Sequence, residues 1–323
     1  MNNIPKSQKA EDSPRSSRLS RQVLRKHLPK IDAMREQRSL TIGSVSQAAL
    51  DDIFMNCRQL EVLVLCDIIG PVTVYDIRNI GNCKMLKALL LPMEIKNPVA
   101  ICSLTNLTHL TFQRQDVWPE MDWLSTVKDI VYAKRYDLQA FSFDGSRQVS
   151  PVNLHQLQLA KCTALTDLRL TNCKLTDVAD PPFPYSCQRI CFRQCSMVNL
   201  HNLIKNHSLL VKLELLDCQV LSEGPLLAPI LNIRRLLPVF SQLFLTFTKS
   251  TRLRSECTKW TQNDVKAFSK WLQIQELSPQ QAGICKQAPG SVSMKFTRSI
   301  NYMPNLQLPE ESIPSAADIV KDL

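Results

Sequence analysis

The sequence predicts an α/β solenoid, in which a curved parallel sheet lines the concave face and helices and loops cover the convex face. Three observations lead to this prediction: a strand-sized apolar skeleton recurs, the mean distance between its copies is typical of a structural repeat, and cysteines stand at fixed places within it. The skeleton is clearest at Leu165-x-x-Leu168-x-Leu170-x-x-Cys173. Its apolar side chains would face inward from a short strand, and Cys173 would close the turn that follows.

Eight copies of the skeleton follow one another, about 26 residues apart on average, which is typical of repeats that stack strand beside strand. Each repeat contacts only its neighbours, so one continuous core can run through the whole region. The copies are Leu60-Leu63-Leu65, Leu86-Leu89-Leu91, Leu107-Leu110-Phe112, Leu138-Phe141-Phe143, Leu165-Leu168-Leu170, Cys187-Ile190-Phe192, Leu210-Leu213-Leu215 and Phe240-Leu243-Leu245.

The positions of the cysteines indicate which class of repeat this is. Three of them close a repeat, and three others stand three residues before the first leucine: Cys173, Cys195 and Cys218, and Cys57, Cys83 and Cys162. This Cys-x-x-Leu-x-x-Leu-x-Leu-x-x-Cys pattern resembles the cysteine-containing leucine-rich repeats best known from F-box proteins, over roughly residues 38–250. The resemblance implies a leucine-rich-repeat solenoid and substrate recognition for an SCF/cullin-type ubiquitin ligase.

The chain divides into four predicted segments. Residues 1–37 are basic and mostly disordered, 38–258 form the solenoid, 259–278 form a C-terminal capping helix, and 279–323 are a largely disordered tail. The capping helix is predicted from Thr261-Gln-Asn-Asp264, which resembles a capping box, and from the apolar stripe that follows it.

Within the solenoid, patterns of apolar and capping residues predict the outer elements. A first, degenerate repeat begins with a strand at 39–42 and a helix that Ser46 caps. Four further segments have helical spacing or length: 74–80, 119–136, 197–207 and 225–239.

The composition excludes several classes of protein. The twelve cysteines sit mostly at repeat positions that should be buried, which favours free thiols and a reducing compartment. No secretory signal or membrane-spanning run is apparent, so we expect the protein in the cytoplasm, the nucleus or both. We also expect it to be a monomer. The net charge of +10 is concentrated at the N-terminus, where the basic run from Arg15 to Lys30 is either a nuclear address, a nucleic-acid contact or, more simply, a solvated tail.

Candidate chemistry is sparse, and the sequence predicts no catalytic residue, metal or cofactor. Cys187, Cys191 and Cys195 lie near two histidines, but the strand period points Cys191 away from the other two, so they cannot converge on one ion. Cys191 is instead expected to be an exposed thiol beside two arginines. No Gly-rich phosphate loop or hydrolase motif is present. Recognition of a protein partner is therefore the predicted function, with nucleic acid and membrane disfavoured.

The candidate site is the concave face, whose residues occupy alternate positions of each strand. Its first repeats are apolar, and its repeats from Asp167 to Glu214 are charged. Apolar residues on a solvent-facing sheet surface indicate that a partner or the chain itself covers it, or they are simply tolerated there. The predicted contact residues are Val62, Val64, Ala88, Leu90, His109, Asp167, Arg169, Arg189, Arg193, Lys212 and Glu214.

Two questions stay open at the level of sequence. The apolar end of the face could contact either a partner or the tail, which carries a run of apolar residues between Met294 and Leu306. The ligase role is also open, because no F-box precedes the repeats: Leu28-Pro29 lies too close to the first strand, and Leu50 to Phe54 has the phase of a repeat helix. The alternative is a ligase-independent scaffold or inhibitor-like binder, and the presence of cullin-ligase components among its partners would distinguish the two.

Overall fold

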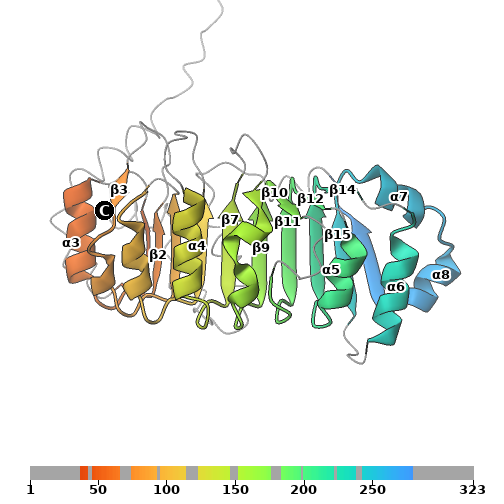
Figure 1. The fold of residues 1–323 in the computed structure, drawn as a ribbon, viewed down its shortest axis with the longest axis horizontal. Helices are drawn as coiled ribbons and strands as arrows, with labels where there is room; N and C mark the ends of the chain where they lie inside the picture. Colours follow the sequence, from red (N-terminus) through yellow and green to blue (C-terminus); the bar gives the residue numbers. More distant parts are fainter. Residues whose placement is uncertain are drawn as a thin grey trace, which may run out of the picture.

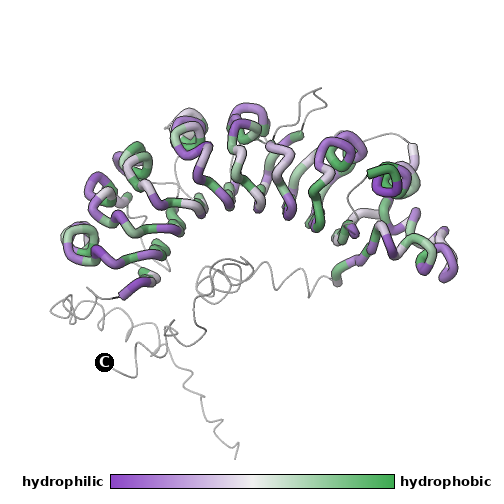
Figure 2. Tube along the Cα trace, turned by 90° about the horizontal axis from the view of Figure 1, so that it is seen from below, coloured by the Kyte–Doolittle hydropathy of each residue, from purple (hydrophilic) through white to green (hydrophobic). Residues whose placement is uncertain are grey.

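The repeats stack into an arc, with strands along its inner side and helices along its outer side (Figures 1 and 2). In this computed structural model the described residues are 37–42, 46–65, 74–92, 95–113, 123–145, 152–175, 183–197, 199–221, 224–237 and 242–278. The predictions for the basic segment and for the tail fall outside these residues. Among the described residues, no helix is both long enough and apolar enough to cross a bilayer.

A ten-stranded parallel sheet forms the inner side of the arc. Its strands pair in chain order, so each repeat adds one strand beside the last, as the α/β leucine-rich-repeat prediction required. The strands are β1 (Ser39–Ile42), β2 (Val62–Leu65), β4 (Ala88–Pro92), β6 (His109–Gln113), β7 (Ala140–Asp144), β9 (Asp167–Thr171), β11 (Arg189–Arg193), β13 (Lys212–Leu216), β15 (Leu243–Phe247) and β16 (Leu272–Glu276).

The outer side carries α-helices, 3-10 helices and two small parallel sheets (Figure 1). The helices are α3 (Gln47–Asn56), η2 (Ile80–Asn82), η3 (Pro98–Ser103), α4 (Trp123–Ala133), η4 (Leu154–Leu157), η5 (Leu159–Lys161), α5 (Leu200–Asn206), α6 (Leu227–Leu236), α7 (Thr251–Cys257) and α8 (Gln262–Phe268). The small sheets pair β3 (Tyr75–Asp76) with β5 (Ile95–Lys96), and β8 (Val152–Asn153), β10 (Cys173–Leu175), β12 (Ser196–Met197) and β14 (Gln219–Val220) in order.

One row of apolar side chains runs in register across all ten strands and explains why they stack. These residues face the helices, and all but the last are buried in one core cluster. Burial of each such side chain contributes about 1.5–3 kcal/mol, so the row alone is a large part of what holds the repeats together. In order, the row is Leu40, Leu63, Leu89, Leu110, Phe141, Leu168, Ile190, Leu213, Leu245 and Ile274.

The closing cysteines connect neighbouring repeats. The Sγ of Cys195 donates to the carbonyl oxygen of Leu170 at 3.5 Å, and the Sγ of Cys218 donates to that of Phe192 at 3.3 Å. Cys195 and Cys218 are both buried. A hydrogen bond with the thiol of Cys195, followed by burial, raises the pKa of Cys218 well above its ordinary value. These thiols therefore act as small buried groups that satisfy carbonyl oxygens.

The structure corrects two of the predicted outer elements. The segment 74–80 is not a helix, because Tyr75–Asp76 pairs with Ile95–Lys96 as a short strand and a single 3-10 turn follows. The predicted capping box at Thr261 and Asp264 is present. However, helix α8 ends at Phe268 and buries no residue, and β16 continues the sheet. The second half of the predicted capping helix is thus a tenth strand.

The last predicted repeat is shifted by two residues. Lys212 pairs with Phe244 and Leu213 pairs with Leu245, so the skeleton there is Gln242-Leu245-Phe247. Leu243, Leu245 and Phe247 are all buried, and a shift of two leaves the inward and outward faces unchanged. The helices predicted at 197–207 and 225–239 are confirmed as α5 and α6, and Ser46 accepts a hydrogen bond from the backbone N–H of Ala49 as the predicted cap.

Candidate partner-binding surface on the concave face

Two rows of side chains cover the concave face, and the backbone register defines them. We name the row that is aligned with Val62 the first concave row, and the row that is aligned with Val64 the second. The first contains Ser39, Val62, Ala88, His109, Ala140, Asp167, Arg189, Lys212, Phe244 and Gln273. The second contains Thr41, Val64, Leu90, Thr111, Ser142, Arg169, Cys191, Glu214, Thr246 and Gln275. Ten of the eleven predicted contact residues lie in these two rows, and Arg193 lies on the same side of β11, two residues beyond Cys191.

The apolar end of both rows is buried. Val62 and Val64 are 2% and 3% exposed, and Ala88 and Leu90 are fully buried, although all four face away from the core. The structure thus brings these four predicted contact residues together but leaves them little accessible surface. Their role in contacting a partner or the tail stays a prediction.

His109 lies at the border between the apolar and charged parts of the face. Its side chain is 7% exposed, and its Nδ1 lies 2.6 Å from the hydroxyl of Thr108. Burial lowers the pKa of His109 to about 4, against the opposing effect of the negative charge of Asp167. His109 is therefore a neutral, largely enclosed group at neutral pH.

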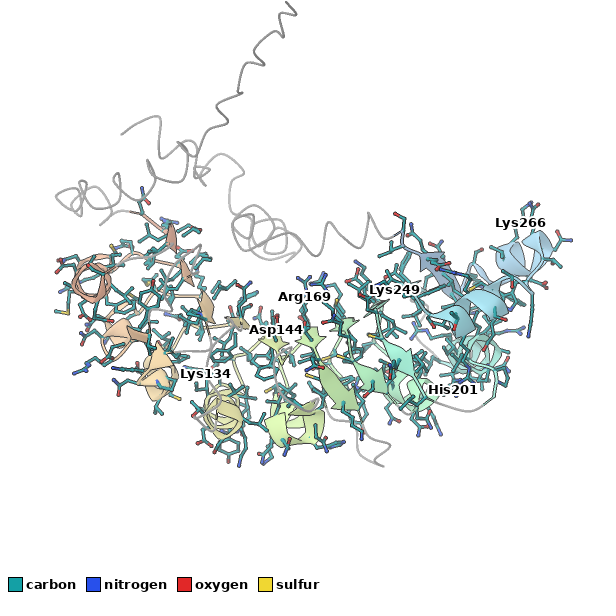
Figure 3. All side chains as sticks on the ribbon, turned by 90° about the horizontal axis from the view of Figure 1, so that it is seen from above. Lys134, Asp144, Arg169, His201, Lys249 and Lys266 are labelled. Atoms are coloured by element: carbon teal, nitrogen blue, oxygen red, sulfur yellow. The ribbon has the colours of Figure 1, made fainter. Side chains whose placement is uncertain are left out.

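The charged part of the face is accessible to solvent and contains two ion pairs. Arg189 binds both carboxylate oxygens of Asp167, and the Nζ of Lys212 lies 2.9 Å from a carboxylate oxygen of Glu214. Arg193 lies half-buried at the end of the same strand as Arg189. Arg169 is exposed between these groups and extends toward the inside of the arc, as does Asp144 (Figure 3).

A cavity of about 420 Å³ opens at the C-terminal end of the charged part. Phe244 is 39% exposed there and provides an aromatic surface. Thr246 adds a hydroxyl oxygen that is buried and has no hydrogen-bond partner among the described residues. The lining residues are Gln188, Arg189, Val211, Lys212, Glu214, Phe244, Thr246, Gln275 and Leu277.

The sequence identified only part of this cavity. Arg189, Lys212 and Glu214 are among the predicted contact residues. The alternation along the strand, with Leu243 and Leu245 facing inward, also places Phe244 and Thr246 on the concave face. Gln275 and Leu277 were missed, because 259–278 was expected to be helical. A useful signal was available: Leu272-Gln-Ile274-Gln alternates apolar and polar residues, which is the period of a half-buried strand.

Cys191 differs from the prediction in its exposure. The thiol was expected to be accessible beside Arg189 and Arg193, but it is only 8% exposed. Its neighbours in the second concave row are Arg169 and Glu214, whose longer side chains flank it on the adjacent strands. Cys191 therefore does not present a reactive thiol to solvent.

Cys195 and His207, which belong to the cysteine and histidine cluster of the sequence, both contact backbone carbonyl oxygens. Cys195 donates to backbone carbonyl oxygens, and His207 is fully buried with its two ring nitrogens beside the carbonyl oxygens of Leu203 and Phe183. Within the described part of the chain, no group of three or more His, Cys, Asp or Glu side chains is arranged to hold a metal ion. The described chemistry of the concave face is that of ion pairs, an aromatic ring and one unpartnered hydroxyl.

No family model matches the chain, and no curated protein sequence matches it. Among solved structures, the chain is similar to an internalin from Listeria monocytogenes, with 14% sequence identity and a TM-score of 0.45. That match covers 80% of this chain and 73% of the internalin chain. The fold is therefore established by the repeat and its ten-stranded sheet: the chain contains a leucine-rich-repeat solenoid.

Proposed function

We propose that this chain is a non-enzymatic recognition module that binds a protein partner on the open part of its concave face. The observation that carries the proposal is the row of charged, accessible side chains on β9, β11 and β13, next to the cavity at Phe244. Charged rims around an apolar centre are typical of protein interfaces. The predicted contact residues Asp167, Arg169, Arg189, Arg193, Lys212 and Glu214 form the accessible part of this surface.

Two contexts for this binding follow from the resemblance to F-box proteins. One is substrate recognition in an SCF/cullin-type ubiquitin ligase, and the other is a ligase-independent scaffold or inhibitor-like binder. The segment that most resembles an F-box, Leu50 to Phe54, lies in α3, where Leu50 and Phe54 are fully buried in the first repeat. Side chains buried in this way cannot contact an adaptor protein, which favours the ligase-independent context.

Affinity capture with concave-face variants tests the proposal. The full chain would be compared with Arg169→Glu and Lys212→Glu, which reverse an exposed and a partly exposed charge, and with Lys205→Glu as a control on the convex helix α5. We expect the two concave variants to lose a partner that the wild type and Lys205→Glu retain. Equal capture by all four proteins would contradict concave-face recognition.

The same experiment separates the two contexts. Quantitative mass spectrometry of the captured proteins would report whether cullin adaptor subunits are enriched with the wild type. Their enrichment would support the ligase context, and their absence alongside a retained partner would support the scaffold or inhibitor-like context.

A further inference from the structure

The cavity at Phe244 lies where the two concave rows meet the end of the sheet. Phe244 in the first row is flanked by Lys212 on β13 and Gln273 on β16. Thr246 in the second row is flanked by Glu214 and Gln275 on the same two strands. The ring and the hydroxyl therefore lie on one strand, two residues apart, and face the same side.

Phe244 is the only aromatic residue in the two concave rows, and it is substantially exposed. At the same register, Val62, Ala88 and Ala140 are small and buried, and Asp167, Arg189 and Lys212 are charged. A large aromatic surface in a concave setting is typical of an anchor position at a protein interface, where a partner side chain removes it from water.

Thr246 provides an independent indication that the cavity binds a ligand, because its hydroxyl group has no hydrogen-bond partner among the residues described. Its Oγ1 is buried yet forms no hydrogen bond within the described part of the chain. Buried hydroxyl groups are nearly always hydrogen-bonded, and leaving one without a partner costs free energy. A backbone or side-chain polar group of a ligand in the cavity would satisfy it.

The charges around the cavity indicate what the rest of the ligand carries. Arg189 and Lys212 are paired with Asp167 and Glu214. Arg169, in contrast, is exposed toward the inside of the arc (Figure 3). It takes no part in the ion pairs among the described residues of this surface. The guanidinium of Arg169 is therefore a positive charge that a ligand can pair with, and a carboxylate of the ligand would form a charge-assisted hydrogen bond with it.

The sheet sets the separation between the two features. Arg169, Cys191, Glu214 and Thr246 occupy one row on four successive strands, so three strand spacings separate the first from the last. At about 4.8 Å per spacing this is about 14 Å. The two-residue offset of Phe244 along β15 brings its separation from Arg169 to about 16 Å, which an extended chain covers in roughly four to five residues. A single extended segment can thus reach both features while it crosses the strands.

We propose that the cavity at Phe244 anchors an extended segment of the protein partner, with a large apolar side chain against Phe244 and a carboxylate about four or five residues away that pairs with Arg169. This rests on the proposed function, because it assigns the chemistry of the segment that the concave face recognises. Thr246 hydrogen-bonds the segment next to the apolar anchor.

Selection from a phage-displayed library of random dodecapeptides on the purified full chain tests this directly. We expect enriched peptides to carry Phe, Trp, Leu or Met four or five residues from Asp or Glu. Their dissociation constants, measured by fluorescence anisotropy, should rise at least tenfold for Phe244→Ser and for Arg169→Gln. Thr246→Val, which removes only the hydroxyl, should have a smaller effect, and Lys205→Gln on α5 should have none. Circular dichroism would establish that each variant is folded.

Each other outcome overturns the inference. No enriched peptide, peptides without the apolar–acidic spacing, or peptides that bind Phe244→Ser and Arg169→Gln unchanged would remove the cavity as an anchor. Peptides that match this chain's own sequence and compete with it would assign the cavity to a copy or segment of the chain. The proposed function fails separately, when affinity capture is unchanged by Arg169→Glu and Lys212→Glu.

Discussion

The second concave row contains a buried and an exposed position only three strands apart, although its residues share one backbone register. Leu90 on β4 is fully buried, whereas Arg169 on β9 is exposed, and only β6 and β7 lie between them. On the opposite side of the same strands, Leu89 and Leu168 are both buried in the core. The core side is therefore uniform from repeat to repeat, and the concave side changes completely.

This difference follows from how a solenoid is stabilised. Each repeat is held by its apolar residues on the core side and by the ladder of backbone hydrogen bonds to its neighbours, and neither constrains the concave side chains strongly. The concave residues are therefore free to differ among repeats. Their differences, rather than the repeat itself, carry the information about what the protein binds.

The most direct test of this comparison is to introduce glutamate at the buried position, Leu90, and at the exposed position, Arg169. Leu90→Glu would place a carboxylate in a buried site, and we expect it to lower the free energy of unfolding by about 3 kcal/mol or more. Arg169→Glu, at the exposed position, should change the free energy of unfolding by no more than about 0.5 kcal/mol. Urea unfolding followed by circular dichroism would measure both.

A small effect of Leu90→Glu would mean that the apolar end is open in solution, and it would return Val62, Val64, Ala88 and Leu90 to the accessible contact surface. Leu90→Met serves as the control, because it conserves the volume and the apolar character and should cost less than about 1.5 kcal/mol.

The sequence was sufficient for the fold because the core row is periodic. Seven of the eight predicted skeletons are in the observed register, including Leu86-Leu89-Leu91, and the degenerate first strand was placed correctly. The register of the last skeleton was not determined by pattern, since Leu243, Leu245 and Phe247 offer two equivalent alignments. Pairing with β13 selects one of them, and pairing depends on tertiary contacts.

The sequence was enough to predict which residues of the candidate site face the concave side, but not how exposed each of them is. The period of two placed Arg169, Cys191 and Phe244 on the concave face. It could not show that Cys191 is buried between longer side chains, or that Phe244 borders a cavity. Both depend on which residues stand on the adjacent strands, and for Phe244 one of those strands, β16, was expected to be a helix.

A second test concerns His109, which marks the border between the two parts of the face. Its pKa is about 4 in the folded protein, against an ordinary value of 6.5. As the pH falls below 6.5, the unfolded chain takes up a proton that folded His109 does not, so stability falls with pH down to about 4. The linkage predicts a loss of about 2 kcal/mol between pH 7.5 and pH 5 from this residue.

His109→Gln should remove that contribution, so the variant should lose less stability than the wild type over the same interval. Buried His207, whose pKa is also lowered by burial, remains in both proteins and cancels in the comparison. Identical pH dependence of the two proteins would show that His109 is solvated, and that the buried part of the face ends before β6.

The smallest expected effect is that of the ion pair between Asp167 and Arg189, at the start of the open part. Both side chains are partly exposed, 23% and 33% respectively, so solvent screens their attraction. A double-mutant cycle with Asp167→Ala and Arg189→Ala should give a coupling free energy of about 0.2–1 kcal/mol, and 1 M salt should reduce it. A coupling above about 2 kcal/mol would instead make the pair a structural element, held in place for stability. A small coupling means that Arg189 can exchange Asp167 for a partner's carboxylate at little cost, which is what a recognition surface of paired charges requires.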